Sequence, residues 1–405
     1  MASGADPAWY RQFFDSFVGK DGNGQALTTP GEGLLGSAIF FLVVCFVANF
    51  VLIYRGLTKG IEWFCKWAMP ALVICALIVL VRVLTLGTPD PAKPDQNVLN
   101  GLGFMWNPST QNISLGQSLR NPEMWLEAAG QIFFSLSVGF GIIITYASYL
   151  RQDDDVALSS LTAAAGNEFC EVALGGLITV PAAFVFLGGS LFQGQRSNLF
   201  SLGFVTLPNV FDQMIAGRVV GFLFFFLLFL AAITSSLSML QPAIALLEEG
   251  LGLKRKASVA LLGFVTAVGA AFVVYFSKGL AALDTLDFWV GTFCIYVLAT
   301  FQVILFGWVL GVDRGFEELN RGAEIRIPHW VRYVIKYVSP LYLLTIFGFW
   351  CYQKLPGQIQ TIRQSLVAQL SIGFILIVTV LFTILIAQAV KRWDAAERAE
   401  KEVSP

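Results

Sequence analysis

Hydroxyl side chains gather inside one apolar stretch of the chain, ITSSLSML. They belong to Thr234, Ser235, Ser236 and Ser238. Hard cations bind oxygen ligands, so these hydroxyls could complete a sodium shell together with backbone carbonyls. Alternatively, each hydroxyl donates to a carbonyl of the preceding helical turn. The cluster is therefore a candidate sodium site whose remaining ligands must come from elsewhere in the chain.

An amide and a carboxylate form a second candidate site. Asn167 and Glu171 are four residues apart, which places them on one face of a helix, whereas Glu168 points elsewhere. Polar and ionisable residues inside membrane spans are functional candidates by default. This pair could ligate a cation or hold a buried charge. The alternative is an interfacial pair near the inner end of the span.

Further polar residues lie near the ends of apolar stretches. Asp284 and Asp287 open one stretch on its outer side, as a gate acid or as first-turn acids that the helix dipole favours. Tyr149, Gln241 and Glu249 lie near the inner ends of two others. These three side chains are predicted to form an inner gate or to cap the membrane interface.

Such side chains need an element that exposes backbone groups inside the membrane. Residues 131–149 read QIFFSLSVGFGIIITYASY, within a segment long enough to cross a bilayer. Its middle, residues 135–141, holds two serines and two glycines, which weaken a helix. Because lipid cannot satisfy freed backbone groups, a break there must line a cavity, an ion or a substrate. The alternative is a kinked or closely packed helix.

The composition defines the class of protein. The 405 residues are 56% hydrophobic and 13% charged, against about 25% charged in soluble domains. The chain is therefore an all-α polytopic membrane protein. A net charge of −1 suggests no nucleic-acid partner. The sequence has no GxSxG, phosphate-cradling loop or CxxC, and the single His329 leaves little for acid–base work. We expect neither an enzyme nor an organic cofactor.

The apolar stretches predict nine transmembrane helices. Basic residues follow the first one at Arg55, Lys59 and Lys66, so the chain starts outside and ends in the cytoplasm. The expected spans are residues 34–54, 60–84, 123–150, 156–187, 218–249, 257–276, 286–310, 329–350 and 366–390.

Several motifs resemble the neurotransmitter:sodium symporter family, and most closely its bacterial amino-acid transporters. They are the stretch at 131–149, NEFCE at 167–171, ITSSLSMLQPAIALLEE at 233–249, RGLTKGIEWFCKWAMP at 55–70 and LDFWVGT at 286–292. The resemblance covers nearly the whole chain. The family has twelve spans, of which the first ten form two inverted five-helix repeats. The nine spans here would match the last nine, with the first repeat incomplete.

The resemblance also implies a division of the chain. Its parts are an outer loop-like segment at 1–34, the last two helices of the first repeat at 35–86, an outer loop at 87–122, the second five-helix repeat at 123–310 with an outer lid loop at 188–216, two accessory helices at 311–390 and a cytoplasmic tail at 391–405. The family's first broken helix, which supplies much of both sodium sites, has no counterpart here.

Residue by residue, the resemblance implies a substrate site and two sodium sites. The substrate contacts would be Phe134, Ser135, Ser137, Phe140 (as an aromatic lid), Ser235 and Met239. Ser135 and Asn167 would bind the sodium ion that touches the substrate. The second sodium ligands would be Ala231, Thr234 and Ser235.

The remaining roles concern gating and anions. The resemblance implies an outer gate at Asp287 and an inner gate at Tyr149, Gln241 and Glu249. Gly60 and Pro70 match a pattern linked to helix unwinding for inward ion release, although a plain proline kink is the alternative. Glu171 stands where chloride-dependent members have a small residue, so its own charge would make the protein chloride-independent.

We therefore expect sodium-coupled symport of a neutral, apolar amino acid by alternating access, in the plasma membrane. The partners would be the amino acid, Na⁺ and lipid, and a second copy of the chain in a homodimer is a further candidate partner. Because three helices of the family have no match, we expect an N-terminally truncated form with impaired or no transport. The alternatives are a non-transporting membrane fragment and a regulatory or sensor protein that binds without transport. The DNA preceding Met1 would discriminate between them.

Overall fold

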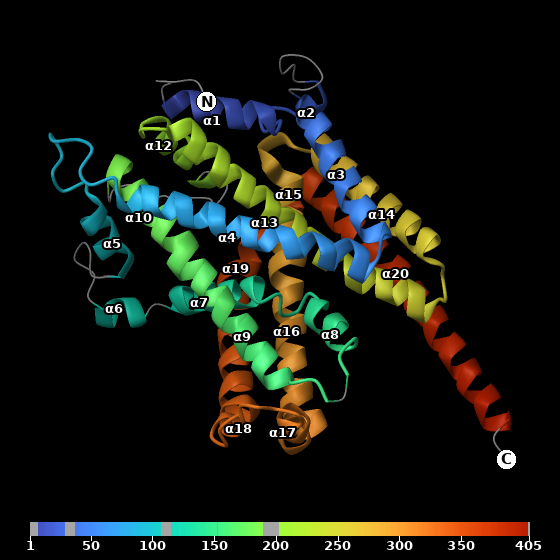
Figure 1. The fold of residues 1–405 in the computed structure, drawn as a ribbon. Coiled ribbons are helices and arrows are strands. Elements are labelled where there is room, and N and C mark those ends of the chain that lie inside the picture. The colour runs from blue at the N-terminus through green and yellow to red at the C-terminus, as the bar shows by residue number, and fades with distance from the viewer. Residues whose placement is uncertain are drawn as a thin grey trace. The chain divides into compact units, whose positions relative to one another are not determined.

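Regular structure in this protein is helical wherever the structure describes it. The structure is a computed structural model. It describes residues 7–28, 37–106, 115–120, 122–151, 153–188 and 202–403, and every regular element in those ranges is a helix (Figure 1). The expected all-helical membrane architecture is confirmed.

Among the described residues, seven helices are long and apolar enough to cross a membrane. They are Leu57–Leu84, Val156–Phe186, Gly217–Gly250, Arg255–Tyr275, Lys278–Asn320, Val331–Gln364 and Leu366–Arg398. Two expected spans are not among them. The first corresponds to α3 (Ala38–Tyr54), which has 17 residues, and the other is broken into α7 (Pro122–Ser135) and α8 (Ile142–Ala147). The count of nine spans stays a prediction.

Most of these long helices change character along their length. α-Helical stretches alternate with π-helical turns, which often occur at functional sites. In chain order the main parts are η2 (Leu57–Glu62), α4 (Trp63–Leu84), α9 (Val156–Glu168), η3 (Phe169–Gly176), α10 (Leu177–Leu187), α13 (Gly217–Ala245), η6 (Leu246–Gly250), α14 (Arg255–Tyr275), α15 (Ala281–Leu286), η8 (Asp287–Cys294), α16 (Ile295–Ile304), η9 (Leu305–Gly311), α17 (Val312–Asn320), α18 (Val331–Tyr333), η10 (Val334–Val338), α19 (Ser339–Gln364) and α20 (Leu366–Val403).

Three segments that the sequence analysis treats as loops contain helices. They are α1 (Pro7–Phe17) and α2 (Gln25–Thr28) in 1–34, α5 (Val98–Trp106) and α6 (Leu115–Leu119) in 87–122, and η5 (Leu202–Thr206) and α12 (Leu207–Asp212) in 188–216. Residues 189–201 of the expected lid lie outside the described residues. Of these short helices, α5 and α12 pack against α10, α1 packs against η5, and α2 packs against α14.

The chain forms two compact units. Unit 1 comprises Met1–Val18, Glu62–Met124 and Leu161–Ser235, and unit 2 comprises Gly19–Ile61, Trp125–Ser160 and Ser236–Pro405.

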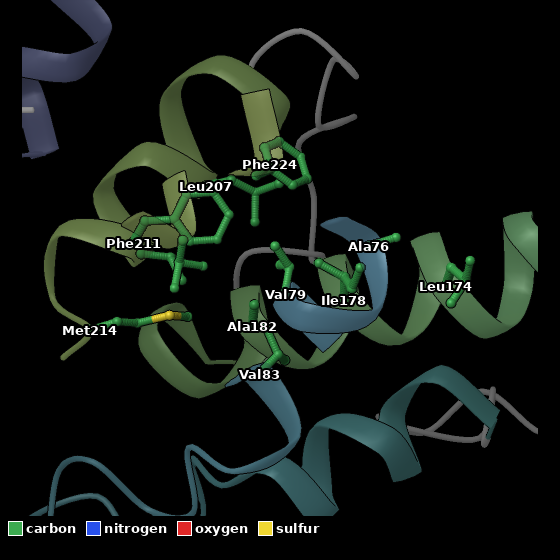
Figure 2. Close-up of a cluster of buried hydrophobic side chains, with 12 residues drawn as sticks. Ala76, Val79, Val83, Leu174, Ile178, Ala182, Leu207, Phe211, Met214 and Phe224 are labelled. Carbon is green, nitrogen blue, oxygen red and sulfur yellow. The ribbon is translucent and has the colours of Figure 1, made fainter. Parts of the chain in front are cut away.

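Unit 1 is organised around a cluster of buried aliphatic and aromatic side chains (Figure 2). The cluster draws Val79 from α4, Ile178 from α10, Phe211 from α12 and Phe224 from α13. The rings of Phe211 and Phe224 lie 5.2 Å apart between centroids. Helix α12 therefore closes one end of the same core that the long helices α4, α10 and α13 share.

The start of the chain also docks onto α12 in unit 1. Tyr10 on α1 is only 4% exposed, and its hydroxyl hydrogen-bonds with the Asp212 carboxylate. Phe14 stacks on Phe204 with ring centroids 5.7 Å apart. Burial, followed by the charge and hydrogen bond of Asp212, raises the pKa of Tyr10 to about 12.

In unit 2, α14 packs against α3, and Phe272 of α14 stacks on Phe374 of α20. At one end, the turn after α1 is held by the loop that follows α14. The Ser277 hydroxyl donates to the Gly19 carbonyl at 2.7 Å, and the Gly24 amide donates to the Tyr275 carbonyl at 2.7 Å. These bonds fix residues 19–24 although they lie far from α14 in the sequence.

Candidate functional site

The predicted break in the helix at 131–149 is confirmed. Helix α7 ends at Ser135 and α8 begins at Ile142. The Val138 amide donates to the Phe133 carbonyl at 2.9 Å, and the Ser137 amide donates to the Phe134 carbonyl at 3.1 Å. This pair of bonds is the Schellman arrangement that ends many helices. Ser137 takes the left-handed position, with φ +56°, which glycine usually occupies.

Two glycines give the break its path. Gly139 has φ +88°, and a Cβ atom there would lie 2.5 Å from the Ile295 carbonyl oxygen of α16. Gly141 has φ +78°, and its neighbour across the turn is Pro242 of α13. Larger residues would be strained at both positions, and at position 139 they would also collide with α16. Glycine therefore allows the broken segment to lie directly against the backbone of α16.

Aromatic rings flank the break on both sides. Phe134 and Phe140, both predicted substrate contacts, pack edge to face with centroids 5.8 Å apart. Phe133 packs against Tyr296 at 5.3 Å, and the Tyr296 hydroxyl donates to the Leu343 carbonyl at 3.1 Å. Phe134 is 52% exposed. The break thus presents apolar ring surface beside backbone polar groups.

The structure brings together two of the three predicted inner-gate residues. The Gln241 side-chain amide donates to the Tyr149 hydroxyl at 3.0 Å, and Gln241 is buried. Glu249 is exposed at the end of η6. Its neighbour Glu248 pairs instead with Arg255, at 3.1 Å. The gate contact in unit 2 is therefore a neutral Tyr–Gln pair.

A second contact in this region was not predicted. The Tyr146 hydroxyl donates to the Ser238 hydroxyl at 3.0 Å. Tyr146 lies three residues before Tyr149, as Ser238 lies three before Gln241, so two parallel contacts join α8 and the turn that follows it to α13. That equal spacing was visible in the sequence and could have indicated the pairing.

In the hydroxyl cluster of α13, one hydroxyl, that of Thr234, bonds back to the preceding helical turn, which was the alternative to a sodium site. The Thr234 hydroxyl bonds back to the Leu230 carbonyl at 3.1 Å and to the Ala231 carbonyl at 2.9 Å. A hydroxyl that donates its proton still has lone pairs for a cation. The Thr234 and Ala231 oxygens already lie side by side in unit 1, and neighbouring Ser235 is exposed. These neutral oxygens fit a hard monovalent cation.

Asn167 and Glu171 share a helix face, as predicted. The Asn167 amide nitrogen lies 3.5 Å from a Glu171 carboxylate oxygen, across the junction of α9 and η3. Both side chains are half-buried. Ser135 belongs to unit 2, so its relation to Asn167 stays a prediction, as does that of Ser235 to Met239.

Gly60 lies in a π-helical turn at the start of its span. A Cβ atom there would lie 2.0 Å from the Leu52 carbonyl oxygen, which no side chain can accommodate. Pro70 lies inside α4. The wider turn of η2 precedes the proline, so the hydrogen bonding at this end of the helix is already irregular.

The predicted outer-gate acid, Asp287, is exposed and opens the π-helical turn η8. The helix begins before it, with η7 (Lys278–Leu280) and α15. Asp284 lies in the first turn of α15, as the first-turn alternative predicted, whereas Asp287 lies one turn further along, at the start of η8.

The long apolar helices of the described residues are those of a multi-pass membrane protein. The model of the Sodium:neurotransmitter symporter family matches residues 26–395. The chain belongs to that family.

Its relatives include sodium-dependent transporters. An uncharacterised one from Methanocaldococcus jannaschii is 27% identical over 73% of this chain and 57% of its own length. Another from Haemophilus influenzae is 28% identical over 76% of this chain and 64% of its own length. Sodium-dependent nutrient amino acid transporter 1 of Drosophila yakuba is 27% identical over 76% of this chain and 46% of its own length. The chain thus spans about half to two thirds of these relatives.

A solved structure shares the fold. MhsT, crystallised in complex with L-phenylalanine, superposes with a TM-score of 0.63 at 24% sequence identity. The match covers 84% of this chain and 76% of MhsT.

Proposed function

We propose that this chain serves sodium-coupled symport of a neutral, apolar amino acid by alternating access. The observation that carries the proposal is the break between α7 and α8, within a member of the sodium symporter family. A broken helix offers unpaired backbone groups to the charged ends of an amino acid. The ring surfaces of Phe134 and Phe140 beside it suit an apolar side chain.

Sodium coupling is supported by the neutral oxygens of α13. Thr234 and Ala231 offer adjacent hydroxyl and carbonyl oxygens, and Ser235 follows them. We assign the second sodium ion to this group and the substrate-linked sodium ion to Ser135 and Asn167. Sodium would supply positive charge next to the substrate carboxylate, while Ser137 and Met239 would contact the substrate itself.

Chloride independence is supported by Glu171. Its carboxylate lies beside Asn167, so a fixed negative charge is already near the proposed sodium ligand. A bound chloride ion would repel this carboxylate and is not needed to balance the sodium charge.

Alternating access requires the inner end of the site to open. In unit 2 the bond between Tyr149 and Gln241 ties the turn after α8 to α13 and must break for inward release. Gly60 and Pro70 would allow the start of their span to unwind, and Asp287 and Glu249 would act in the outer and inner gates.

We propose that the 405-residue chain alone gives little or no transport, because it spans about half to two thirds of the relatives that it matches. The test compares this chain with the same chain preceded by the residues that its reading frame encodes upstream of Met1. Both are reconstituted in proteoliposomes with an inward sodium gradient and labelled phenylalanine. We expect sodium-dependent uptake only by the longer chain, and its loss in a Thr234→Ala, Ser235→Ala double variant.

Three results would contradict the proposal in different ways. Robust uptake by the 405-residue chain would refute its impairment. Uptake by the longer chain without sodium would refute coupling. Sodium-dependent binding without uptake by the longer chain would instead favour a sensor that binds without transport.

A further inference from the structure

The surface of unit 2 carries an apolar groove that takes no part in the proposed transport site. Its volume is about 410 Å³, within the range of small-molecule sites. The lining residues come from η10 and α19: Tyr337, Val338, Leu341, Tyr342, Thr345 and Ile346. All of them lie in the membrane-spanning helix Val331–Gln364.

The groove is open along the outside of its helix. Val338 is 58% exposed and Leu341 is 68% exposed. The Thr345 hydroxyl donates to the Leu341 carbonyl at 2.7 Å, so its polar proton is satisfied within the helix. From residue 337 to residue 346 the helix rises about 14 Å, which is close to the thickness of one leaflet's hydrocarbon. The groove therefore matches one acyl chain in shape and length.

A positive charge lies at one end of the groove. The Lys336 ammonium group is 5.4 Å from the centre of the Tyr337 ring, which lines the groove. Among the residues that the structure describes, Lys336 makes no ion pair, whereas Arg332 pairs with Asp313 at 2.9 Å. The protein thus leaves the Lys336 charge available to an external anion.

The chain leading to Lys336 is basic. Residues 321–336 hold four arginines and lysines against one glutamate. Such segments beside a membrane span attract anionic lipids. Trp330 and Tyr333 are 65% and 64% exposed. Exposed Trp and Tyr rings of this kind are typical of the lipid headgroup level. Charge and aromatic residues therefore place Lys336 at the membrane interface.

We propose that this groove binds an anionic phospholipid, whose acyl chain lies along residues 337–346 and whose phosphate is bound by Lys336. A zwitterionic lipid offers the same chain but a neutral headgroup, so it would gain less from Lys336. The headgroup thus determines which lipid is preferred, and the groove determines where its acyl chain lies.

The 405-residue chain, purified in detergent, tests this directly. It is incubated with equal amounts of phosphatidylglycerol and phosphatidylcholine with identical chains, and retained lipid is counted by native mass spectrometry. We expect phosphatidylglycerol to be preferred. Lys336→Gln should lower its retention about fivefold, the effect of one interfacial cation. The control Lys256→Gln, at an exposed lysine of α14, should leave retention unchanged.

A second variant tests the groove itself. Thr345→Trp should fill the groove and lower retention of both lipids, and Thr345→Phe serves the same purpose if the tryptophan variant is not monodisperse. Equal retention of the two lipids, equal effects of both lysine variants, or no effect of filling the groove would each overturn the proposal. A dimer that dissociates in the Thr345 variant would identify a second copy as the occupant and would also overturn it.

Discussion

Ser137 holds a backbone conformation that residues other than glycine rarely adopt. Its φ of +56° costs about 1–2 kcal/mol, yet the left-handed position that follows α7 is occupied by this serine and not by glycine. Strain of this kind is often retained where a side chain has a function. The proposed contact of Ser137 with the substrate supplies such a function.

Replacing Ser137 separates strain from function. Ser137→Gly should raise the free energy of unfolding by about 1 kcal/mol, because glycine takes the left-handed conformation without a steric cost. Ser137→Ala keeps the strain and should show no gain. Thermal unfolding in detergent measures both variants. Equal stability of the glycine and alanine variants would contradict the strain, and unchanged amino-acid binding by both would contradict the role in binding.

Tyr10 predicts a pH dependence for the docking of α1. Burial and Asp212 raise the pKa of Tyr10 to about 12, against about 10 in an unfolded chain. The neutral phenol thus favours the docked state, so its contribution is complete below pH 10 and is lost as the pH rises through 12.

Absorbance of the phenolate measures this transition. One tyrosine should titrate near pH 12 in the wild-type protein and be missing in Tyr10→Phe. An Asp212→Asn variant should lower the titration midpoint of Tyr10. A wild-type curve that the phenylalanine variant reproduces in full would contradict the buried Tyr10–Asp212 contact.

At the scale of elements, the break between α7 and α8 depends on how closely it approaches α16. Gly139 faces the Ile295 carbonyl with no room for a methyl group. The break is thus specified by a neighbouring backbone as well as by weak local helix propensity. An isolated peptide of the same sequence lacks that neighbour.

Gly139→Ala should destabilise the protein by about 1–3 kcal/mol, because it adds both a steric collision and backbone strain. The matched control is Gly103→Ala in α5, where a methyl group meets no atom within 4 Å. That change should be neutral or stabilising, since alanine favours helix. Thermal unfolding with helix content followed by circular dichroism distinguishes them. Similar losses in both variants would show that the approach to α16 does not matter.

The sequence predicted this break because glycine and serine are poor helix formers. It also grouped Tyr149, Gln241 and Glu249 by their position near the inner ends of their spans, but it did not predict which of the three would be in contact. It did not predict the π-helical turns, such as η2 around Gly60, because these depend on packing between helices. It also missed the helices α1 and α12. Their residues are short amphipathic stretches among polar ones, and only their partners, such as Asp212 for Tyr10, show that they dock.

At the scale of the whole molecule, the backbone leaves the helical conformation at Gly311, with φ +87°, so η9 ends next to the expected span end at 310, and α17 follows as a separate helix. Charged residues mark the membrane boundary in a sequence, but a helix can continue through water beyond it. Helix α20 shows this, because it continues to Val403 through the expected tail. The topology must therefore be tested by finding on which side of the membrane each segment lies, and not by where the helices end.

The charge pattern predicts an outer position for residue 95 and a cytoplasmic C-terminus. A green fluorescent protein fused after Pro405 should fluoresce in a bacterial host, whereas the same fusion after Asp95 should not. Alkaline phosphatase at the two positions should give the opposite activities. Fluorescence at both positions would contradict the predicted orientation.

The Leu52 carbonyl that occupies the space beside Gly60 has a consequence for comparisons between relatives. Every homologue that builds this turn must keep glycine at this position, whether or not its helix unwinds. Conservation of the glycine is therefore a measure of packing, and evolutionary constraint there carries no information about ion release. Evidence for unwinding must come from Pro70. Its replacement by alanine should slow the rate of inward release while leaving the fold, and the turn at Gly60, intact.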